Sequence, residues 1–148
     1  EINAVQFSEE VDKRDLNDRV AYVGRKVGEE KNAFFQQADV FVFPTYYYNE
    51  CFPLVILEAM EYKLPAISTN EGGIPDMVKD GENGLICEKQ NPVSLADCIA
   101  KLLDDEELRV KMGNAGYDKF CREFTLQQFE HRMLDILSQN LPQKEKEN

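Results

Sequence analysis

The sequence predicts an α/β fold in which helices flank a parallel sheet, and three observations lead to this prediction. Residues 39–43 form a short apolar run that Pro44 ends, and residues 65–69 are the next strand candidate. An apolar helical pattern over residues 53–62 lies between them. Short apolar runs that alternate with helices through short connections are typical of buried parallel strands in right-handed βαβ units.

The other elements follow from the same patterns. Ahead of residue 39 we expect a short strand over residues 2–7, a strand over residues 19–23 that ends at Gly24, and a helix over residues 29–38. The glycines of residues 72–84 indicate a loop with one helical turn, followed by a last strand over residues 84–87. Helical spacing of apolar residues then predicts helices over residues 94–103, 106–120 and 125–138.

Length and charge limit the classes of function. The 148 residues suit one domain, which we place at residues 1–142, with a frayed charged tail over residues 143–148. The net charge of −11 argues against a nucleic-acid partner and against direct membrane contact through anionic lipid. No apolar run is long enough to span a bilayer.

The cysteines and the first residues indicate the compartment. The four cysteines form no CxxC pair and have no histidines at metal-ligand spacing, and free thiols are typical of a reducing compartment. The first residues lack the basic and apolar segments of a signal peptide. We therefore expect a cytoplasmic protein that holds no metal.

Two acids around a helix start form the most informative pattern in the chain. Glu50 precedes the helix of residues 53–62, in which Pro53 suits the first helical position and Glu58 lies among apolar residues. The backbone amides of Phe52, Leu54 and Val55 lie at this helix start, where amide groups and the helix dipole favour an anion.

The expected strand order brings more loops to the same place. Ligands of parallel sheets bind at the carboxyl ends of the strands. The segments that leave three expected strands contain Gly24-Arg25, Glu50 and Gly72-Gly73. A double glycine lets backbone approach a ligand closely, although it is more often simply a turn.

A molecule with a diphosphate between two polyols fits such a site, and a nucleotide sugar is such a molecule. Amides at a helix start donate hydrogen bonds to phosphate oxygens, and a carboxylate accepts hydrogen bonds from hydroxyl groups. Glu58 would then bind the ribose and Glu50 would face the sugar. The alternatives are that Glu50 is a solvated loop acid and that Glu58 pairs with a cation such as Lys63.

Five blocks of the chain, in this order, resemble the carboxyl-terminal domain of family-4 retaining glycosyltransferases of the GT-B fold. The first two are Val-Ala-Tyr-Val-Gly-Arg (residues 20–25) and Ala-Asp-Val-Phe-Val-Phe-Pro-Thr (residues 38–45). The third spans residues 50–60 with its Glu-x7-Glu pair, and the last two span residues 64–76 and 80–86. The likeness covers most of the chain after residue 18.

The resemblance implies a Rossmann-like donor-binding domain, the carboxyl-terminal half of a GT-B fold, truncated so that its first strand or strands are missing. It implies transfer of a hexose from a nucleotide diphosphate sugar to a glycan or glycolipid acceptor, with no metal or other cofactor, in polysaccharide assembly. By the same resemblance Glu50 is the catalytic residue at the sugar and Glu58 binds the ribose. The amides of Phe52, Leu54 and Val55 hold the diphosphate, Gly72 and Gly73 line the donor site, and Arg25 lies near the base.

The resemblance also implies an absent partner. The acceptor-binding amino-terminal domain lies outside this chain, so we expect the chain alone to be inactive. The full-length enzyme is expected in the cytoplasm, with the inner face of the membrane as the alternative. The loop of residues 45–49 departs from the family by three tyrosines, which could stack on a sugar or pack against the absent domain.

Two other functions stay open. One is a non-catalytic module that binds a nucleotide diphosphate. The other is a different GT-B enzyme, such as a sugar-nucleotide epimerase or a phosphorylase. The sequence disfavours this last group, because it shows no cofactor-binding Lys and no His-rich acid–base set.

Overall fold

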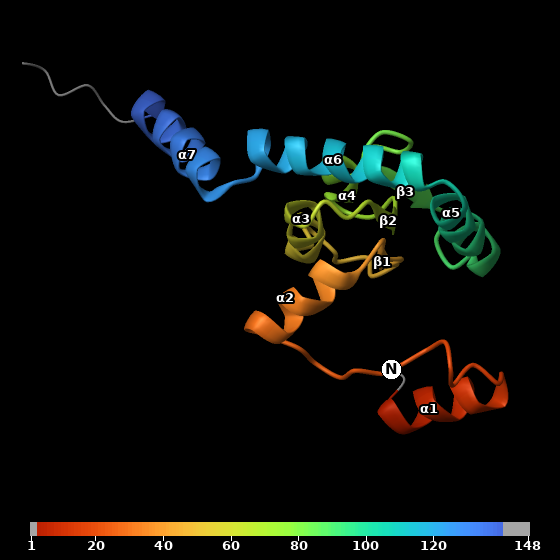
Figure 1. Ribbon diagram of the computed structural model, residues 1–148. Helices are drawn as coiled ribbons and strands as arrows, with labels where there is room; N and C mark the ends of the chain where they lie inside the picture. Colours follow the sequence, from red (N-terminus) through yellow and green to blue (C-terminus); the bar gives the residue numbers. More distant parts are fainter. Residues whose placement is uncertain (1–2, 141–148) are drawn as a thin grey trace, which may run out of the picture. The chain divides into compact units, whose positions relative to one another are not determined.

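The computed structural model describes residues 3–140 (Figure 1). The chain divides into two compact units, Glu1–Gln36 and Gln37–Asn148. The predicted domain limit at residue 142 and the tail of residues 143–148 lie outside the described residues.

The first unit begins with a helix where a strand was predicted. Helix α1 (Ala4–Lys13) covers most of residues 2–7, and residue 2 itself is not described. The Asn3 side chain accepts a hydrogen bond from the Gln6 backbone, and the Gln6 side chain accepts one from the Asn3 backbone. This reciprocal capping box satisfies amides that would otherwise lack partners at the helix start. The capping box favours a helix over a strand for residues 4–7.

The strand predicted over residues 19–23 is also wrong. This segment belongs to no strand: the amides of Arg19 and Val20 donate to the Leu16 carbonyl oxygen in a turn, and Tyr22 and Val23 are exposed. A strand needs a neighbouring strand to accept and donate its ladder hydrogen bonds, and the described sheet consists of three strands from the second unit. The unit ends in α2 (Gly28–Gln37), close to the predicted helix over residues 29–38.

The second unit has the predicted parallel sheet. Its strands are β1 (Phe41–Phe43), β2 (Ala66–Thr69) and β3 (Gly84–Cys87), in the order β1-β2-β3. Both strand pairs are parallel, with Phe41 opposite Ala66 and Ala66 opposite Gly84. Every residue of β2 is buried, the polar Ser68 and Thr69 included, as expected for the central strand of a parallel sheet.

Helices pack against the sheet in two apolar clusters. Helices α3 (Leu54–Glu61) and α4 (Ile74–Met77) connect the strands, and their apolar residues form one cluster with Ala66 and Ile86. Helix α5 (Pro92–Asp104) and part of α6 (Glu106–Glu123) form the other cluster with Ile67 and Leu85. Alternate strand residues thus belong to different clusters, as the two faces of a pleated sheet require.

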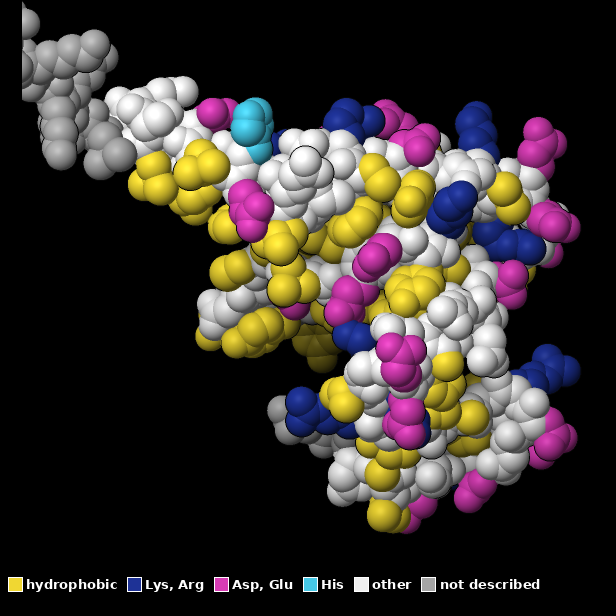
Figure 2. Space-filling view, turned by 60° about the vertical axis from the view of Figure 1, so that its left-hand side comes forward, with side chains coloured by type: hydrophobic (Ala, Val, Ile, Leu, Met, Phe, Trp, Pro, Cys, Tyr) yellow, Lys and Arg dark blue, Asp and Glu magenta, His cyan; other side chains and the backbone are white. Residues whose placement is uncertain are grey.

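The last helix leaves its apolar side uncovered. Helix α7 (Leu126–Asn140) has no buried residue. Its apolar side chains gather on one side, seen as yellow atoms next to the grey chain end in Figure 2. They include Phe129, Met133, Ile136 and Leu137, all of which are exposed. No described helix is both long enough and apolar enough to cross a membrane.

The packing of α6 against the end of α3 generates a stability prediction. A Cβ added at Gly113 would lie 2.0 Å from the Lys63 carbonyl oxygen, whereas one at Gly116 would meet nothing closer than 3.5 Å. We expect Gly113→Ala to lower the free energy of unfolding by about 1–3 kcal/mol, because backbone must move to admit the methyl group.

The matched control is Gly116→Ala in the same helix. It should be neutral or stabilising by up to about 1 kcal/mol, because alanine is the better helix former. Urea unfolding followed by far-UV circular dichroism measures both. Equal effects of the two substitutions would contradict the close packing at Gly113.

Candidate functional site

The loops that leave the three strands are tied together at the carboxyl edge of the sheet. Ser68 and Thr69, at the end of β2, are completely buried. The Ser68 hydroxyl donates to the Phe43 carbonyl oxygen at 2.7 Å, and the Thr69 hydroxyl donates to the carbonyl of Thr45. These bonds satisfy buried polar groups and fix the start of the loop after β1.

Gly72 and Gly73 lie directly against the Glu50–Cys51 backbone. The Gly73 amide donates to the Cys51 carbonyl oxygen at 2.7 Å. A Cβ at Gly72, which has a positive φ of 48°, would lie 1.6 Å from the Glu50 carbonyl oxygen. Glycine is therefore required here by the approach of two loops of the same chain. The structure brings three predicted site residues, Glu50, Gly72 and Gly73, to one place.

The loop that carries Glu50 is a defined turn. The Glu50 amide donates to the Tyr47 carbonyl oxygen at 2.9 Å, and the Glu50 residue is half-buried. The Cys51 thiol donates to the Asn49 carbonyl oxygen at 3.5 Å, so it takes part in the same turn. Glu50 thus occupies a fixed position immediately before α3.

The loop after β3 joins this arrangement through an ion pair. The Lys89 ammonium lies 2.6 Å from the Glu71 carboxylate, whose side chain is 15% exposed. Glu71 directly precedes the two glycines that contact Glu50 and Cys51. Sequence analysis missed this pair, because nothing in the local pattern joins residues eighteen positions apart.

The start of α3 is open. The helix begins at Leu54 and Pro53 is its N-cap residue, so the prediction of Pro53 at the first helical position is wrong by one residue. The Ile56 amide donates to the Pro53 carbonyl oxygen at 3.0 Å. The amides of Leu54 and Val55 come before it in the chain and have no acceptor within the helix. Phe52 and Leu54 are 40% and 67% exposed, whereas Pro53 between them is buried, so the helix start is exposed at the residues on either side of its N-cap.

Glu58 lies on the same helix as these amides. It is half-buried between Leu57 and Ala59, which are both buried. Glu58 also takes part in an interaction with another part of the chain. The ammonium of Lys63, suggested as its partner, lies 5.1 Å from the centre of the Tyr117 ring.

Arg25 is the remaining predicted site residue. It lies in the first unit, on an exposed segment after residues 19–23. Its proximity to a nucleotide base stays a prediction.

These positions allow specific chemistry. Amides at the start of a helix stabilise a negatively charged group through hydrogen bonds and the helix dipole. A half-buried carboxylate beside such a group accepts hydrogen bonds from hydroxyls. The second unit therefore has a helix end whose amides are able to donate hydrogen bonds to an anion, with one acid before it and one acid further along the same helix.

The contact between the glycine loop and the Glu50 turn leads to a prediction. Gly72→Ala should destabilise the fold by about 1–2 kcal/mol for the left-handed backbone, and by about 1–3 kcal/mol more for the clash. The backbone amide signals of Glu50 and Cys51 should shift in an NMR spectrum, because these residues must move.

Gly81→Ala is the matched control. Gly81 also has a positive φ, of 76°, but an added Cβ would meet nothing within 4 Å. It should therefore show only the backbone penalty, with the Glu50 signals unchanged. A Gly72 variant no less stable than the Gly81 variant would refute the contact.

Comparison with known proteins shows to which family the chain is related. The family model described as "Glycosyl transferases group 1" matches residues 3–119. D-inositol 3-phosphate glycosyltransferase of Corynebacterium efficiens is 37% identical over 98 residues, which are 66% of this chain and 23% of that protein. The chain thus spans about a quarter of that relative's length.

Solved structures agree on the fold. Sucrose-phosphate synthase from Thermosynechococcus elongatus superposes with a TM-score of 0.82 and 30% identity, over 91% of this chain and 33% of that one. Anabaena HepE in complex with UDP and glucose superposes with a TM-score of 0.82 and 19% identity, over 91% of this chain and 36% of that one. The chain therefore belongs to the group 1 glycosyltransferases, and its parallel sheet with flanking helices is the Rossmann-like architecture of their GT-B fold.

Proposed function

We propose that this chain is the donor-binding part of a retaining glycosyltransferase that moves a hexose from a nucleotide diphosphate sugar to a glycan or glycolipid acceptor. One observation carries the proposal. The open start of α3 lies next to Glu50, which a turn and the glycine loop hold in place. Glu58 follows on the same helix.

The diphosphate is the group that the helix start suits best. The amides of Phe52, Leu54 and Val55 would donate to its oxygens, and the helix dipole adds favourable electrostatic energy. Negative charge grows on the diphosphate as the glycosidic bond breaks. Fixed dipoles that already point at this charge lower the barrier to bond cleavage.

The two acids would bind the polyols on either side. Glu50 faces the transferred sugar, and Glu58 accepts hydrogen bonds from the ribose hydroxyls. Retention of configuration and independence of metal rest on the family resemblance. The complexes of HepE from Anabaena with UDP make UDP the first nucleotide to test, because that protein shares the fold.

The acceptor would be bound by another part of a longer protein. The chain spans 23% of its Corynebacterium relative, which leaves most of such an enzyme outside it. An apolar groove of about 740 Å³ lies between the start of α3 and α7, and Phe52, Leu54, Phe129 and Met133 contribute to it. A further domain that covers this groove would stand beside Glu50. We place the enzyme in the cytoplasm, with the inner face of the membrane as the alternative.

Nucleotide binding tests the donor site in the chain itself. Titration calorimetry with UDP, GDP and ADP should give a measurable affinity for at least one of them. Glu58→Gln should weaken that affinity about tenfold or more, because hydrogen bonds to charged groups are the stronger ones. Glu61→Gln, an exposed position on the same helix, should have no effect. No binding of any of the three nucleotides would sink the proposal.

Sugar transfer tests the role of Glu50. In the full-length enzyme, Glu50→Gln should lower turnover of the nucleotide sugar by about a hundredfold or more while the diphosphate still binds, since the amides at α3 remain. The present chain alone should release no sugar from UDP-glucose, GDP-mannose or ADP-glucose. Full activity of the Glu50 variant would remove this residue from the mechanism, and robust turnover by the chain alone would refute the need for another domain.

A further inference from the structure

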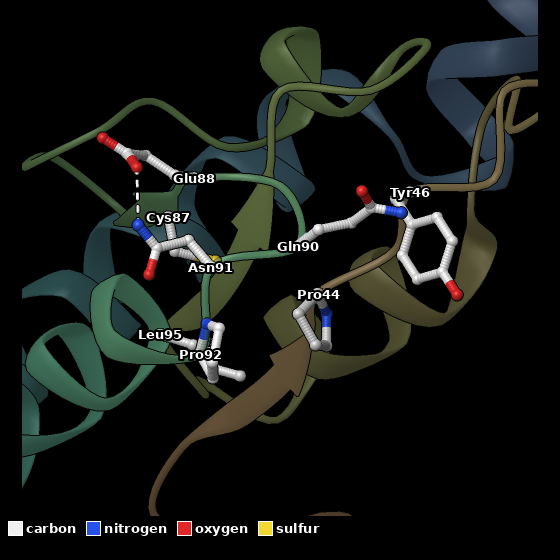
Figure 3. A pocket seen from close by; sticks show the side chains of 8 residues that line it. All are labelled: Pro44, Tyr46, Cys87, Glu88, Gln90, Asn91, Pro92 and Leu95. Atoms are coloured by element: carbon white, nitrogen blue, oxygen red, sulfur yellow. Dashed lines mark hydrogen bonds between the residues drawn. The ribbon is translucent and has the colours of Figure 1, made fainter.

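A pocket of about 430 Å³ opens at the carboxyl edge of the sheet, between the loop after β1 and the turn after β3. Its volume falls within the range of about 300–1,000 Å³ typical of small-molecule sites. Figure 3 shows it from close by. The lining residues are Pro44, Tyr46, Cys87, Glu88, Gln90, Asn91, Pro92 and Leu95.

The two sides of the pocket differ in chemistry. Tyr46 is 62% exposed and presents its ring at the mouth. Gln90 has a positive φ of 56°, and its side chain extends across the pocket toward Tyr46 in Figure 3. The pocket is therefore lined by a flat aromatic ring and by a planar amide, which both donates and accepts hydrogen bonds.

The turn that carries Gln90 is rigid. The Asn91 side chain accepts hydrogen bonds from the Val93 and Ser94 amides at 3.0 and 3.1 Å, and so caps α5. Its amide group donates to the Glu88 carboxylate at 2.7 Å, the dashed line of Figure 3. Asn91 is thus occupied by the fold, and it holds the Glu88 carboxylate on the side of the turn that faces away from Tyr46.

The inner wall is apolar and uncharged. Cys87 is buried and Leu95 is half-buried. Burial raises the pKa of the Cys87 thiol, so the thiol stays protonated and behaves as a small hydrophobic group. None of the residues that line the pocket is cationic. This lining suits a neutral polyol better than a phosphate.

The pocket belongs to the same group of loops as Glu50. Tyr46 immediately precedes the turn from Tyr47 to Glu50, and Lys89, between Glu88 and Gln90, pairs with Glu71 at 2.6 Å. Glu71 in turn precedes the glycines that contact the Glu50 backbone. A ligand in the pocket would therefore lie on the same edge of the sheet as the acid that we assign to the transferred sugar.

We propose that this pocket is a saccharide-binding subsite, in which a pyranose ring stacks on Tyr46 and its hydroxyls bind Gln90. The apolar C–H face of a pyranose matches an aromatic ring, while its hydroxyls match the amide of Gln90. Which sugar fills the subsite, one from the acceptor glycan or one from the donor, rests on the proposed function. The proposal that the pocket binds a saccharide does not depend on the proposed function.

Methyl glycosides test the subsite because they carry no nucleotide. We would titrate the chain with the methyl α-glycosides of glucose, mannose and N-acetylglucosamine, and follow backbone amide signals by NMR. At least one should shift the signals of residues 87–91. Tyr46→Ala should weaken this binding about tenfold, the effect of about 1.4 kcal/mol of lost stacking, whereas Tyr46→Phe should preserve it.

Tyr48 offers the matched control, since it is 81% exposed in the same loop but does not line the pocket. Tyr48→Ala should leave glycoside binding unchanged, and Gln90→Ala should weaken it. The proposal is overturned if no glycoside shifts residues 87–91, if Tyr48→Ala weakens binding as much as Tyr46→Ala, or if Tyr46→Ala has no effect.

Two further titrations separate this proposal from the donor site. Glu58→Gln should weaken UDP binding and leave glycoside binding intact, while Tyr46→Ala should do the reverse. Displacement of the glycoside by UDP-glucose but not by UDP would assign the subsite to the donor sugar. Binding of a glycoside together with UDP-glucose would assign it to the acceptor. Displacement of the glycoside by UDP, which carries no sugar, would show that the nucleotide occupies the pocket and would overturn the proposal.

Discussion

The close approach of Gly72 and Gly73 to the backbone of Glu50 and Cys51 is the constraint on which the site depends. Any side chain at Gly72 would overlap the Glu50 carbonyl oxygen, at 1.6 Å for the first carbon. The contact joins the loops that leave two neighbouring strands, and the pair of Lys89 with Glu71 adds the third loop. Glu50 is therefore positioned by backbone packing rather than by partners of its own side chain.

Helix α3 links this edge to the core. Its middle residues Ile56, Ala59 and Met60 are almost completely buried against the sheet, while Leu54 at its start is exposed. Burying a large apolar side chain contributes about 1.5–3 kcal/mol, and this packing fixes the direction of the helix axis. The helix dipole lies along that axis, so its direction is fixed as well. A short helix can therefore present free amides to a ligand without help from residues around them.

Prediction succeeded where the local signal was unambiguous. Strands β1 and β3 are short, mainly apolar segments, and β2 begins with the apolar pair Ala66-Ile67; a parallel sheet buries such segments on both faces. It failed over residues 2–7, because the short segment fits both periodicities and the capping box at Asn3 and Gln6 decided for helix. It failed over residues 19–23, because a strand exists only where another strand pairs with it.

The sequence by itself determined the chemistry of the site: two acids separated by seven residues, a helix start between them, and a double glycine nearby. These features are local, so spacing alone reveals them. The tertiary structure alone decided which groups meet. It placed the double glycine against the Glu50 turn, paired Lys89 with Glu71, and brought Gln90 and Tyr46 to one pocket. Such contacts join distant parts of the chain through the order and register of the strands, and no local pattern encodes them.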